Sequence, residues 1–423
     1  MSRMRTGGLA TLALTALTST ALITPALVTP AHAAGDRGDP DRSNQRQSMS
    51  QAAERSRVER RREGANKPRS AQAKAMQAGL YAMVDSGATG VVARLETPTF
   101  TWSGAAGMRD HGVEALAQPQ ARFRVASNSK TMVATLVMQE VQRGNWELDM
   151  PVAKVMPGLF PKHQKVTFRQ LLSHTSGIPN GTAELLASQM SDPTSQKQLL
   201  AAISRDYKPQ QHIDAVNAAK WTRPGKFVYS NAGFVALGML LEKQNGRSLN
   251  KLLQERIFTP AGMKETYFAD EPGLRAPALQ EDGWMGGTTW MELDGFDPDF
   301  FGAAGAVVST TEDLNDFTSA LISGKLLDRH LVRLMMTPAS TGLGGYGLGL
   351  YRLPDPCAAE GSGKFLYGHD GASLGTLSAM MVSDDGKRRY SLAGTGRDNT
   401  SLKGRWQLDQ ALVPIFKASC SAG

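Results

Sequence analysis

The sequence contains few cysteines and histidines, with two of the former and seven of the latter among 423 residues. It has neither a His-Glu-x-x-His motif nor a cluster of cysteines and histidines, the patterns from which most protein zinc sites are built. It also lacks an internal repeat. We therefore expect no metal ion and no other cofactor.

Long apolar runs are scarce as well, and the most prominent one extends from Leu9 to Val28. Arg3 and Arg5 precede it, and an Ala-x-Ala sequence that ends at Ala33 follows it, which is the pattern of a secretory signal peptide. No later segment is apolar enough to span a bilayer. We expect residues 1–33 to be removed near Ala33, giving a secreted, extracellular protein without a stable membrane anchor. Retention of the segment as an anchor is the alternative.

Residues 34–72 contain almost no large apolar side chains. They carry ten lysines and arginines against six acidic residues, so much of the net charge of +8 lies outside the remaining body of the chain. Such a stretch buries too little apolar surface to offset the entropy lost on ordering, and we expect a disordered polar linker. Its basic cluster at 60–62 is flanked by Glu59 and Glu63, which indicates a solvated segment and no nucleic-acid partner. Retention near an anionic cell-wall polymer is an alternative role.

The two cysteines, Cys357 and Cys420, are far in sequence from the motifs described below. The expected extracellular compartment permits a disulfide between them. It would close a loop of about 60 residues and contribute roughly 4 kcal/mol by the chain-entropy estimate. We assign this pair a structural role.

The main feature of the sequence is Ser127-x-x-Lys130 at the start of an apolar run that continues to Val141. Side chains three apart lie on one face of a helix, so the serine hydroxyl and the lysine amine are expected to meet. Burial would lower the pKa of the lysine and let it take the hydroxyl proton. The helix N-terminus would in turn favour a developing oxyanion. A helix cap beside a solvated lysine is the alternative interpretation.

The order of the remaining patterns predicts an α+β fold. A helix is expected at 73–85, a hairpin at 90–107, and polar helices at 181–220. The last third of the chain predicts four strands and a final helix, at 345–352, 364–368, 377–382, 390–395 and 402–416. We expect one antiparallel sheet made from the N- and C-terminal segments and flanked by helices. A mostly helical lobe is inserted at roughly 145–300, within a single domain over 73–420.

Three short motifs follow one another along the chain: Ser127-x-x-Lys130, Tyr229-x-Asn231 and His369-Asp370-Gly371. In this order they resemble the motifs of the serine beta-lactamase and penicillin-binding-protein superfamily. The Tyr-x-Asn and His-x-Gly forms are similar to those of class C beta-lactamases and secreted D-alanyl-D-alanine carboxypeptidases. The segments 172–177 and 346–350 support the resemblance, which covers roughly residues 73–420 and implies a beta-lactamase/transpeptidase-like fold.

The resemblance implies an acyl-enzyme mechanism without a cofactor. Ser127 would attack a carbonyl, while Lys130 and the Tyr229 phenol share its proton, first as base and then as acid. Tyr229 could do so only if the nearby cation lowers its pKa from about 10. His369 would orient this proton network. His174, within the supporting segment 172–177, is assigned a structural role in a turn near the site.

The same resemblance implies a set of substrate-binding groups. Asn231 would hold a substrate amide, and Gly371 would let the substrate backbone approach closely. The backbone N–H groups of Ser127 and Ala372 would form the oxyanion hole.

Two departures from the family pattern bear on the substrate. Asp370 stands where the carboxypeptidases carry a small hydroxyl residue that receives the substrate carboxylate, and an acid there would repel it. The carboxypeptidases also place an arginine directly after the Gly-Leu-Gly-Leu run, where this chain has Tyr351 and the arginine follows as Arg352. Because strand side chains alternate, Arg352 is expected to point away from the cleft unless a bulge intervenes.

The resulting expectation is a D-alanyl-D-alanine carboxypeptidase-like serine peptidase acting on peptidoglycan-type peptides. An esterase, a D-aminopeptidase or amidase, and a beta-lactamase fit the same motifs, so the substrate is a small peptide, an ester or a beta-lactam. The alternative from another class is a non-catalytic penicillin-sensing or wall-binding domain. The sequence leaves the oligomeric state open.

Overall fold

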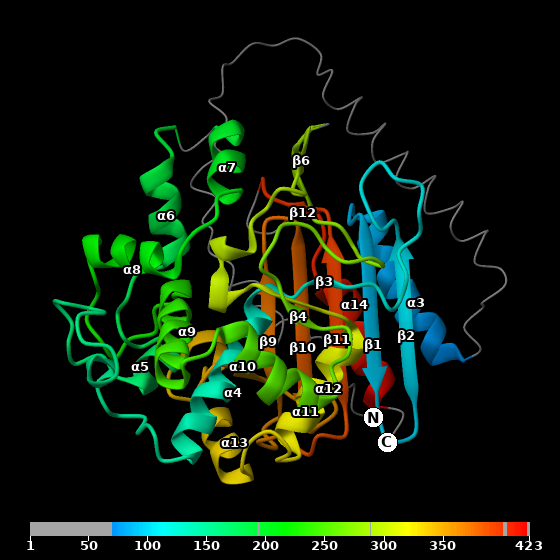
Figure 1. Cartoon of the computed structure of the whole chain (residues 1–423). Helices are drawn as coiled ribbons and strands as arrows, with labels where there is room; N and C mark the ends of the chain where they lie inside the picture. Colours follow the sequence, from blue (N-terminus) through cyan, green and yellow to red (C-terminus); the bar gives the residue numbers. More distant parts are fainter. Residues whose placement is uncertain (1–69, 193–194, 288, 401–403, 421–423) are drawn as a thin grey trace.

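The structure is a computed structural model that describes residues 70–192, 195–287, 289–400 and 404–420. The predicted signal peptide and nearly all of the predicted linker lie outside these residues. The fold is organised around a six-stranded antiparallel sheet in the order β2-β1-β11-β10-β9-β8 (Figure 1). Its strands are β1 (Gly90–Glu96), β2 (Thr101–Gly107), β8 (Tyr351–Pro354), β9 (Phe365–Ala372), β10 (Thr376–Ser383) and β11 (Arg389–Thr395). The N- and C-terminal segments share this sheet, as the sequence predicts.

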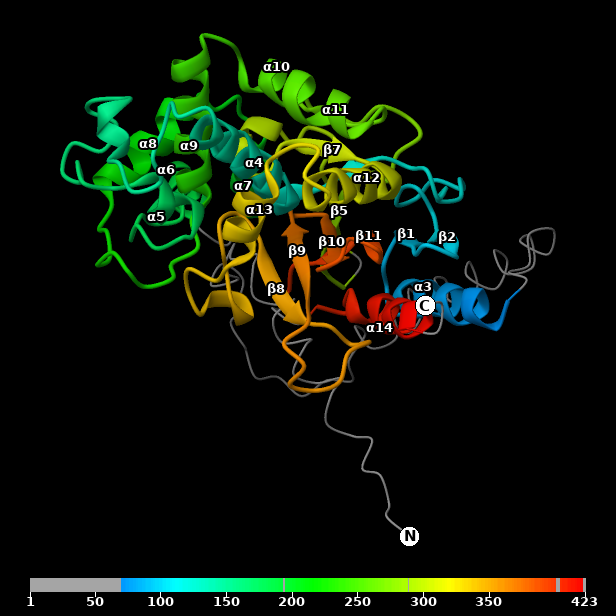
Figure 2. The ribbon, with the colours of Figure 1, turned by 90° about the horizontal axis from the view of Figure 1, so that it is seen from below.

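Both faces of the sheet are covered, which explains why most residues of its strands are buried. One face packs against α3 (Ala71–Asp85) and α14 (Asp409–Cys420), which lie side by side. Figure 2 shows this pair on one side of the strands and α4 (Ser129–Gln142) and α12 (Thr311–Ile322) on the other. Neighbouring residues of β10 illustrate the division, because Ala379 belongs to the core under α3 and α14 and Met380 to the core around α4.

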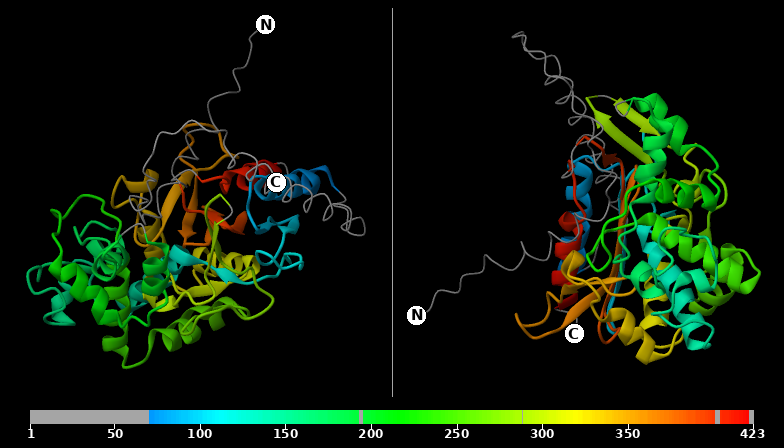
Figure 3. Two further views of the ribbon diagram at one scale, coloured as in Figure 1. Left: turned by 90° about the horizontal axis from the view of Figure 1, so that it is seen from above. Right: turned by 90° about the vertical axis from the view of Figure 1, so that its left-hand side faces the viewer.

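The helical lobe lies on the α4 side of the sheet (Figure 3). Two small three-stranded sheets, β12-β5-β6 and β3-β7-β4, connect it to the large one. Their strands are β3 (Phe123–Arg124), β4 (Tyr267–Phe268), β5 (Asp282–Gly286), β6 (Thr289–Glu292), β7 (Val307–Ser309) and β12 (Arg397–Asp398). The remaining helices are α5 (Phe168–Leu172), α6 (Gly181–Gln189), α7 (Gln196–Ile203), α8 (Pro209–Ala218), α9 (Asn231–Asn245), α10 (Leu249–Leu253), α11 (Thr259–Ala261) and α13 (Arg329–Met336).

Two predicted elements differ from the structure. The strand expected at 345–352 begins only at Tyr351, because the glycines before it, Gly344, Gly345 and Gly349, have positive φ angles of 78°, 132° and 80° that interrupt extended backbone. The final helix begins at Asp409 and not near 402, because Trp406 is instead buried in the core and donates its indole N–H to a backbone carbonyl.

A disulfide joins Cys357, in the loop between β8 and β9, to Cys420 at the end of α14. It closes a loop with a sequence separation of 63 residues. The bridge therefore ties the edge of the large sheet to the helix that covers one of its faces. Among the described residues, none of the helices is both long enough and apolar enough to cross a membrane.

Candidate active site

Ser127 lies in a short 3₁₀ turn, Ala126–Asn128, that leads directly into α4. The residue before it, Ala126, has a φ of 48°, which is uncommon for a residue with a β-carbon and holds the turn in a sharp conformation. Asn128 stabilises the turn with two hydrogen bonds, because its Nδ2 donates to the Val125 carbonyl at 3.0 Å and to Ser378 Oγ at 2.9 Å. The Ser127 side chain is thereby presented at a defined place and is 9% exposed.

Lys130 is fully buried in the first turn of α4, at 0% exposure. Its Nζ lies 2.9 Å from Ser127 Oγ, 2.8 Å from Asn231 Oδ1 and 2.8 Å from the Ala304 carbonyl oxygen. Burial holds the pKa of this amine well below its usual value, although the charge of Asp370 raises it in part. Lys130 is therefore suited to be a neutral base at ordinary pH.

The three neighbours of Lys130 can also be accommodated by the neutral amine that its lowered pKa favours. Such an amine has two N–H groups and one electron pair, and the Ala304 carbonyl and the Asn231 amide oxygen can only accept hydrogen bonds. They occupy the two N–H groups, so the electron pair is left facing the Ser127 hydroxyl. Ser127 can then donate its proton to Lys130, which is the first step in making it a nucleophile.

Tyr229 lies two residues before α9, with its hydroxyl oxygen inaccessible to solvent. Lys130 Nζ lies 4.9 Å from the centre of its ring. Burial raises the pKa of the Tyr229 phenol far above its usual value, and the nearby Ser127 side chain lowers it only in part. The condition for Tyr229 to take up the serine proton, a pKa lowered by the nearby cation, is thus not met, because loss of solvent outweighs the neighbouring groups. Tyr229 remains a protonated phenol.

His369 lies on β9 with its side chain fully buried and its Nε2 3.1 Å from the Tyr346 hydroxyl. Its Nδ1 contacts the Asp370 carbonyl oxygen. Burial, reinforced by the charge of Lys130, lowers the pKa of His369 to about 3, so the ring is neutral. Its hydrogen bonds join it to Tyr346 and to the backbone, and its ring centre lies 6.4 Å from that of Tyr229.

Gly371 follows on the same strand, and the structure shows a packing reason for this glycine. A β-carbon at this position would lie 2.2 Å from the Val125 carbonyl oxygen and 2.7 Å from Ser378 Oγ. The missing side chain thus allows β9 to approach the backbone before Ser127, while the approach of a substrate backbone at this glycine stays a prediction. Ala372 comes next at the end of β9 and is partly exposed. Its part in an oxyanion hole remains a prediction.

Asn231, the first residue of α9, is 7% exposed. Its side-chain oxygen accepts from Lys130, and its Nδ2 donates to Thr182 Oγ1 at 3.0 Å. Both ends of its amide thus have protein partners, and the predicted contact with a substrate amide stays a prediction.

Asp370 and Arg352 lie on opposite faces of the large sheet. Asp370 is 3% exposed and pairs across the sheet with Ala379, on the face under α3 and α14. Arg352 pairs with Tyr367, on the same face as His369, so the expectation that alternation turns it to the other face is wrong. Its guanidinium nevertheless stacks on Phe365, 4.0 Å from the ring centre. Phe365 precedes His369 by four residues, about 13 Å along a strand.

Two residues near the site had no catalytic role in the sequence interpretation. Thr182, at 0% exposure on α6, contacts Asn231 as described above, and no local pattern marks it. His174 is buried with a φ of 55°, and its Nδ1 accepts the backbone N–H of Ser230 at 3.2 Å. Its ring centre lies 4.3 Å from that of Tyr229. The segment 172–177 was the one available signal for His174, because it is part of the family resemblance.

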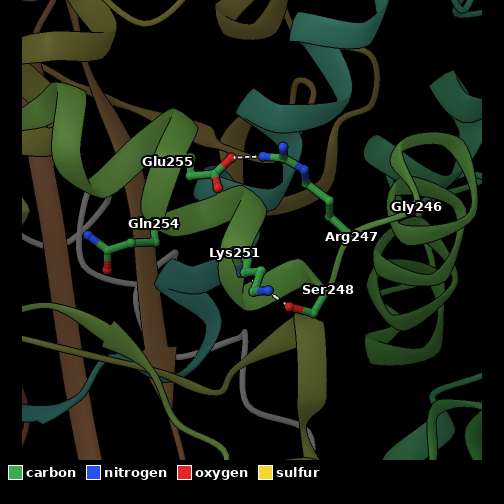
Figure 4. Close-up of a pocket in the computed structure, with 6 residues that line it drawn as sticks. All are labelled: Gly246, Arg247, Ser248, Lys251, Gln254 and Glu255. Atoms are coloured by element: carbon green, nitrogen blue, oxygen red, sulfur yellow. Dashed lines mark hydrogen bonds and ion pairs between the residues drawn. The ribbon is translucent and has the colours of Figure 1, made fainter.

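A separate hollow on the surface is lined by Gly246, Arg247, Ser248, Lys251, Gln254 and Glu255 (Figure 4). It lies beyond the C-terminal end of α9, whereas Asn231 is at the N-terminal end of this 15-residue helix. The two ends are about 22 Å apart. The hollow is therefore remote from the start of α9. Its charges are partly neutralised, because Arg247 forms an ion pair with Glu255 across it.

The chain is similar in sequence to a known family and to penicillin-binding proteins. The family model described as Beta-lactamase matches residues 82–394. Penicillin-binding protein 4 of Amycolatopsis lactamdurans is 28% identical over 305 residues, which cover 66% of this chain and 73% of that protein. Penicillin-binding protein 4* of Bacillus subtilis (strain 168) is 28% identical over 251 residues, which cover 54% of this chain and 51% of that protein. The chain thus spans about half the length of this second relative.

The chain is also similar to solved structures. The crystal structure of a D-stereospecific amidohydrolase from Streptomyces sp. has a TM-score of 0.69 and 28% identity, over 80% of this chain and 97% of that chain. The crystal structure of D-amino acid amidase from Ochrobactrum anthropi SV3 complexed with D-phenylalanine has a TM-score of 0.70. At 22% identity over 84% of this chain and 100% of that chain, the second comparison supports the fold alone.

Proposed function

Because the chain belongs to the Beta-lactamase family and is a serine hydrolase of that fold, we propose that it cleaves amide bonds of D-amino-acid derivatives through an acyl-enzyme on Ser127. The predicted superfamily and the predicted α+β fold are both confirmed. The bond that is cleaved, and the role of each side chain, belong to the proposal.

One observation carries the proposal, namely the contact between Ser127 and a buried lysine. Lys130 Nζ lies 2.9 Å from Ser127 Oγ and has no exposed surface. Burial lowers the pKa of this amine, and its neutral form can take the hydroxyl proton while the oxygen attacks a carbonyl carbon. A solvated lysine beside a helix cap would lack this property.

The proposed reaction has two halves. In the first, a bond forms from Ser127 Oγ to the carbonyl carbon, and the hydroxyl proton moves to Lys130. The C–N bond then breaks as Tyr229 donates its phenolic proton to the leaving amine and regains one from the Lys130 ammonium. In the second half, water attacks the ester and releases the acid. The backbone N–H groups of Ser127 and Ala372 are proposed to stabilise the oxyanion in both halves.

The surroundings of the site favour an amide substrate over a peptide that ends in a free carboxylate. The Arg352 guanidinium is stacked on Phe365, and Asp370 places a buried acid next to His369 in the sequence. A terminal carboxylate is best received by a free positive charge, but the Arg352 guanidinium is already stacked on a ring and Asp370 carries the opposite charge. The likeness to the Streptomyces amidohydrolase agrees with this preference. D-alanyl-D-alanine carboxypeptidase activity is the second candidate, because the sequence relatives are penicillin-binding proteins.

A comparison of substrates tests the proposal. Purified protein and its Ser127→Ala variant are given D-phenylalanine amide, L-phenylalanine amide and a peptide that ends in D-Ala-D-Ala. We expect Ser127-dependent release of ammonia from the D-amide at a rate well above that for the L-amide. Release of D-alanine alone would replace the amidase by the carboxypeptidase. Equal activity in the Ser127→Ala variant would overturn the mechanism.

The proposed place of action is outside the cytoplasm. The pattern of residues 1–33 supports export, and the disulfide between Cys357 and Cys420 suits an oxidising compartment. Intact-mass analysis of secreted protein tests this part, with a mature chain starting near Ala34 as the expected result. A chain recovered only from the cytoplasm at full length would contradict it.

A further inference from the structure

The orientation of one amide decides which way the electron pair of Lys130 points. The side chain of Asn231 has an oxygen that accepts hydrogen bonds and an NH₂ group that donates them. With the oxygen towards Lys130, the amine gives up an N–H and keeps its electron pair for Ser127. If the amide turned by 180°, its NH₂ would donate to that electron pair, and Lys130 could no longer receive the serine proton. Something in the protein must therefore fix this amide.

A short series of hydrogen bonds fixes the Asn231 amide at its Nδ2 end, the end that does not face Lys130. The backbone N–H of Asn231, which can only donate, donates to Asn180 Oδ1 at 3.4 Å. Because this identifies the Asn180 atom as an acceptor, the Thr182 hydroxyl donates its proton to it at 3.1 Å. The Thr182 oxygen is then left to accept, and it does so from Asn231 Nδ2 at 3.0 Å. Each bond in the series determines the direction of the next.

The other end of the series is fixed as well. Asn231 Oδ1 accepts from Lys130, and the second N–H of Lys130 goes to the Ala304 carbonyl, a group that can only accept. The series thus runs between two backbone groups whose polarity cannot change. Thr182 is the one hydroxyl between Asn180 and Asn231 along it, and it is fully buried, so water cannot replace it easily.

We propose that Thr182 is a positioning residue, whose hydroxyl holds the Asn231 amide with its oxygen towards Lys130 and so directs the lysine electron pair at Ser127. This proposal rests on the proposed role of Lys130 as the base for Ser127.

The helix itself does not account for the Thr182 hydroxyl. Thr182 is the second residue of α6, and the residue that caps this helix, Asn180, makes no side-chain capping bond. The neighbouring Gly181 brings the start of α6 against the start of α9, since a β-carbon there would lie 2.6 Å from the Ala232 β-carbon. This close packing of two helix N-termini places the Thr182 hydroxyl beside the Asn231 amide.

The test measures how fast Ser127 reacts with a fluorophosphonate probe. In this reaction Ser127 Oγ forms a bond to phosphorus, fluoride leaves, and the hydroxyl proton passes to Lys130. The rate reports activation of the serine and does not depend on which amide or peptide the enzyme prefers. A failure to hydrolyse D-amides would therefore leave this measurement intact, and the two proposals can fail separately.

The decisive pair of variants is Thr182→Val and Thr182→Ser. The valine keeps the shape and removes the hydroxyl, and we expect the labelling rate to fall about tenfold or more, a part of the roughly 10²–10⁴-fold that a general base contributes. The serine restores the hydroxyl and should restore the rate. Combined with Asn231→Ala, the valine should cause no further loss, because no amide remains to be held.

Controls separate this role from a loss of folding. Thr318→Val removes another buried hydroxyl, which donates to the Asn315 carbonyl on α12, and should leave the labelling rate unchanged. If Thr182→Val does not fold, Asn180→Ala removes the acceptor of the Thr182 proton at a half-buried position and should also slow labelling. Labelling of folded Thr182→Val at the original rate would overturn the proposal, as would an equal loss in the Asn231→Ala background.

Discussion

Gly371 lies against Val125 so closely that a β-carbon on the glycine would come within 2.2 Å of the Val125 carbonyl oxygen. The strand β9 and the turn that carries Ser127 therefore touch through their backbones. Ser378 and Asn128 reinforce the contact with hydrogen bonds to the same carbonyl, at 3.0 Å each. The position of the nucleophile relative to the strand depends on a residue that has no side chain.

Gly371→Ala should disturb both stability and activity. A methyl group cannot fit without displacing the Ser127 turn, and such overpacking typically costs 1–3 kcal/mol, which we take as roughly the expected loss. Thermal unfolding measures the first effect, and fluorophosphonate labelling of Ser127 measures the second. Gly233→Ala is a matched control, because the nearest atom to its added carbon is 3.7 Å away. A Gly371→Ala variant that labels and melts like the original protein would show that the contact is not needed.

Tyr229→Phe should separate the two proton transfers of the proposed reaction. Burial raises the pKa of Tyr229, so its phenol is a proton donor and not the base. Fluoride leaves without a proton, so labelling of Ser127 by the fluorophosphonate should change little. An amine requires a proton to leave, so amide hydrolysis should fall about a hundredfold. Equal losses in both assays would contradict this division and return Tyr229 to the role of base.

The activity should fall at low pH through protonation of Lys130. Burial lowers the pKa of Lys130 well below its usual value, and the neutral amine is the active form. As pH falls through this lowered pKa, the amine gains a proton and kcat/KM declines. The charge of Asp370 raises the same pKa, so Asp370→Asn should move the acid limb to lower pH. A limb that stays in place or moves to higher pH would contradict the assignment.

Stability should also fall at low pH, through a histidine remote from the site. Burial lowers the pKa of His212 to about 4, whereas an unfolded histidine has a value of about 6.5. Between these values the unfolded chain binds the extra proton, so the stabilising effect is complete above about pH 6.5 and is lost as pH falls towards about 4. Urea unfolding measures the free energy of unfolding at about pH 7.5 and at about pH 5. Its decrease between these pH values should be about 2 kcal/mol larger in the original protein than in His212→Gln. Identical losses would contradict the shift.

Local sequence patterns predicted the nucleophile and its partner because their relation is local. Ser127 and Lys130 are three residues apart, and the structure brings their side chains to 2.9 Å. The antiparallel sheet followed in the same way from the apolar runs at each end of the chain. The loss of a strand before Tyr351 was harder to foresee, since it depends on the φ angles of particular glycines.

The remaining features depend on contacts between distant segments. Lys130 meets Asn231 and Ala304 from 101 and 174 residues away, and nothing near Thr182 in the sequence indicates its contact with Asn231. The pKa of Tyr229 depends on the extent of its burial, which only the folded chain determines. Alternation along β8 could not predict that Arg352 stacks on Phe365. The sequence motifs thus predicted the nucleophile and its base, but not the distant residues that position them and shift their pKa values.

The most direct test of the account is to trap and locate the acyl group. The protein is mixed with the p-nitrophenyl ester of D-phenylalanine, quenched in acid at short times, and analysed by intact mass and peptide mapping. The account predicts one D-phenylalanyl group on Ser127, with its formation slowed in Lys130→Arg and absent in Ser127→Ala. An acyl group on another residue, or ester hydrolysis undiminished in Ser127→Ala, would contradict it.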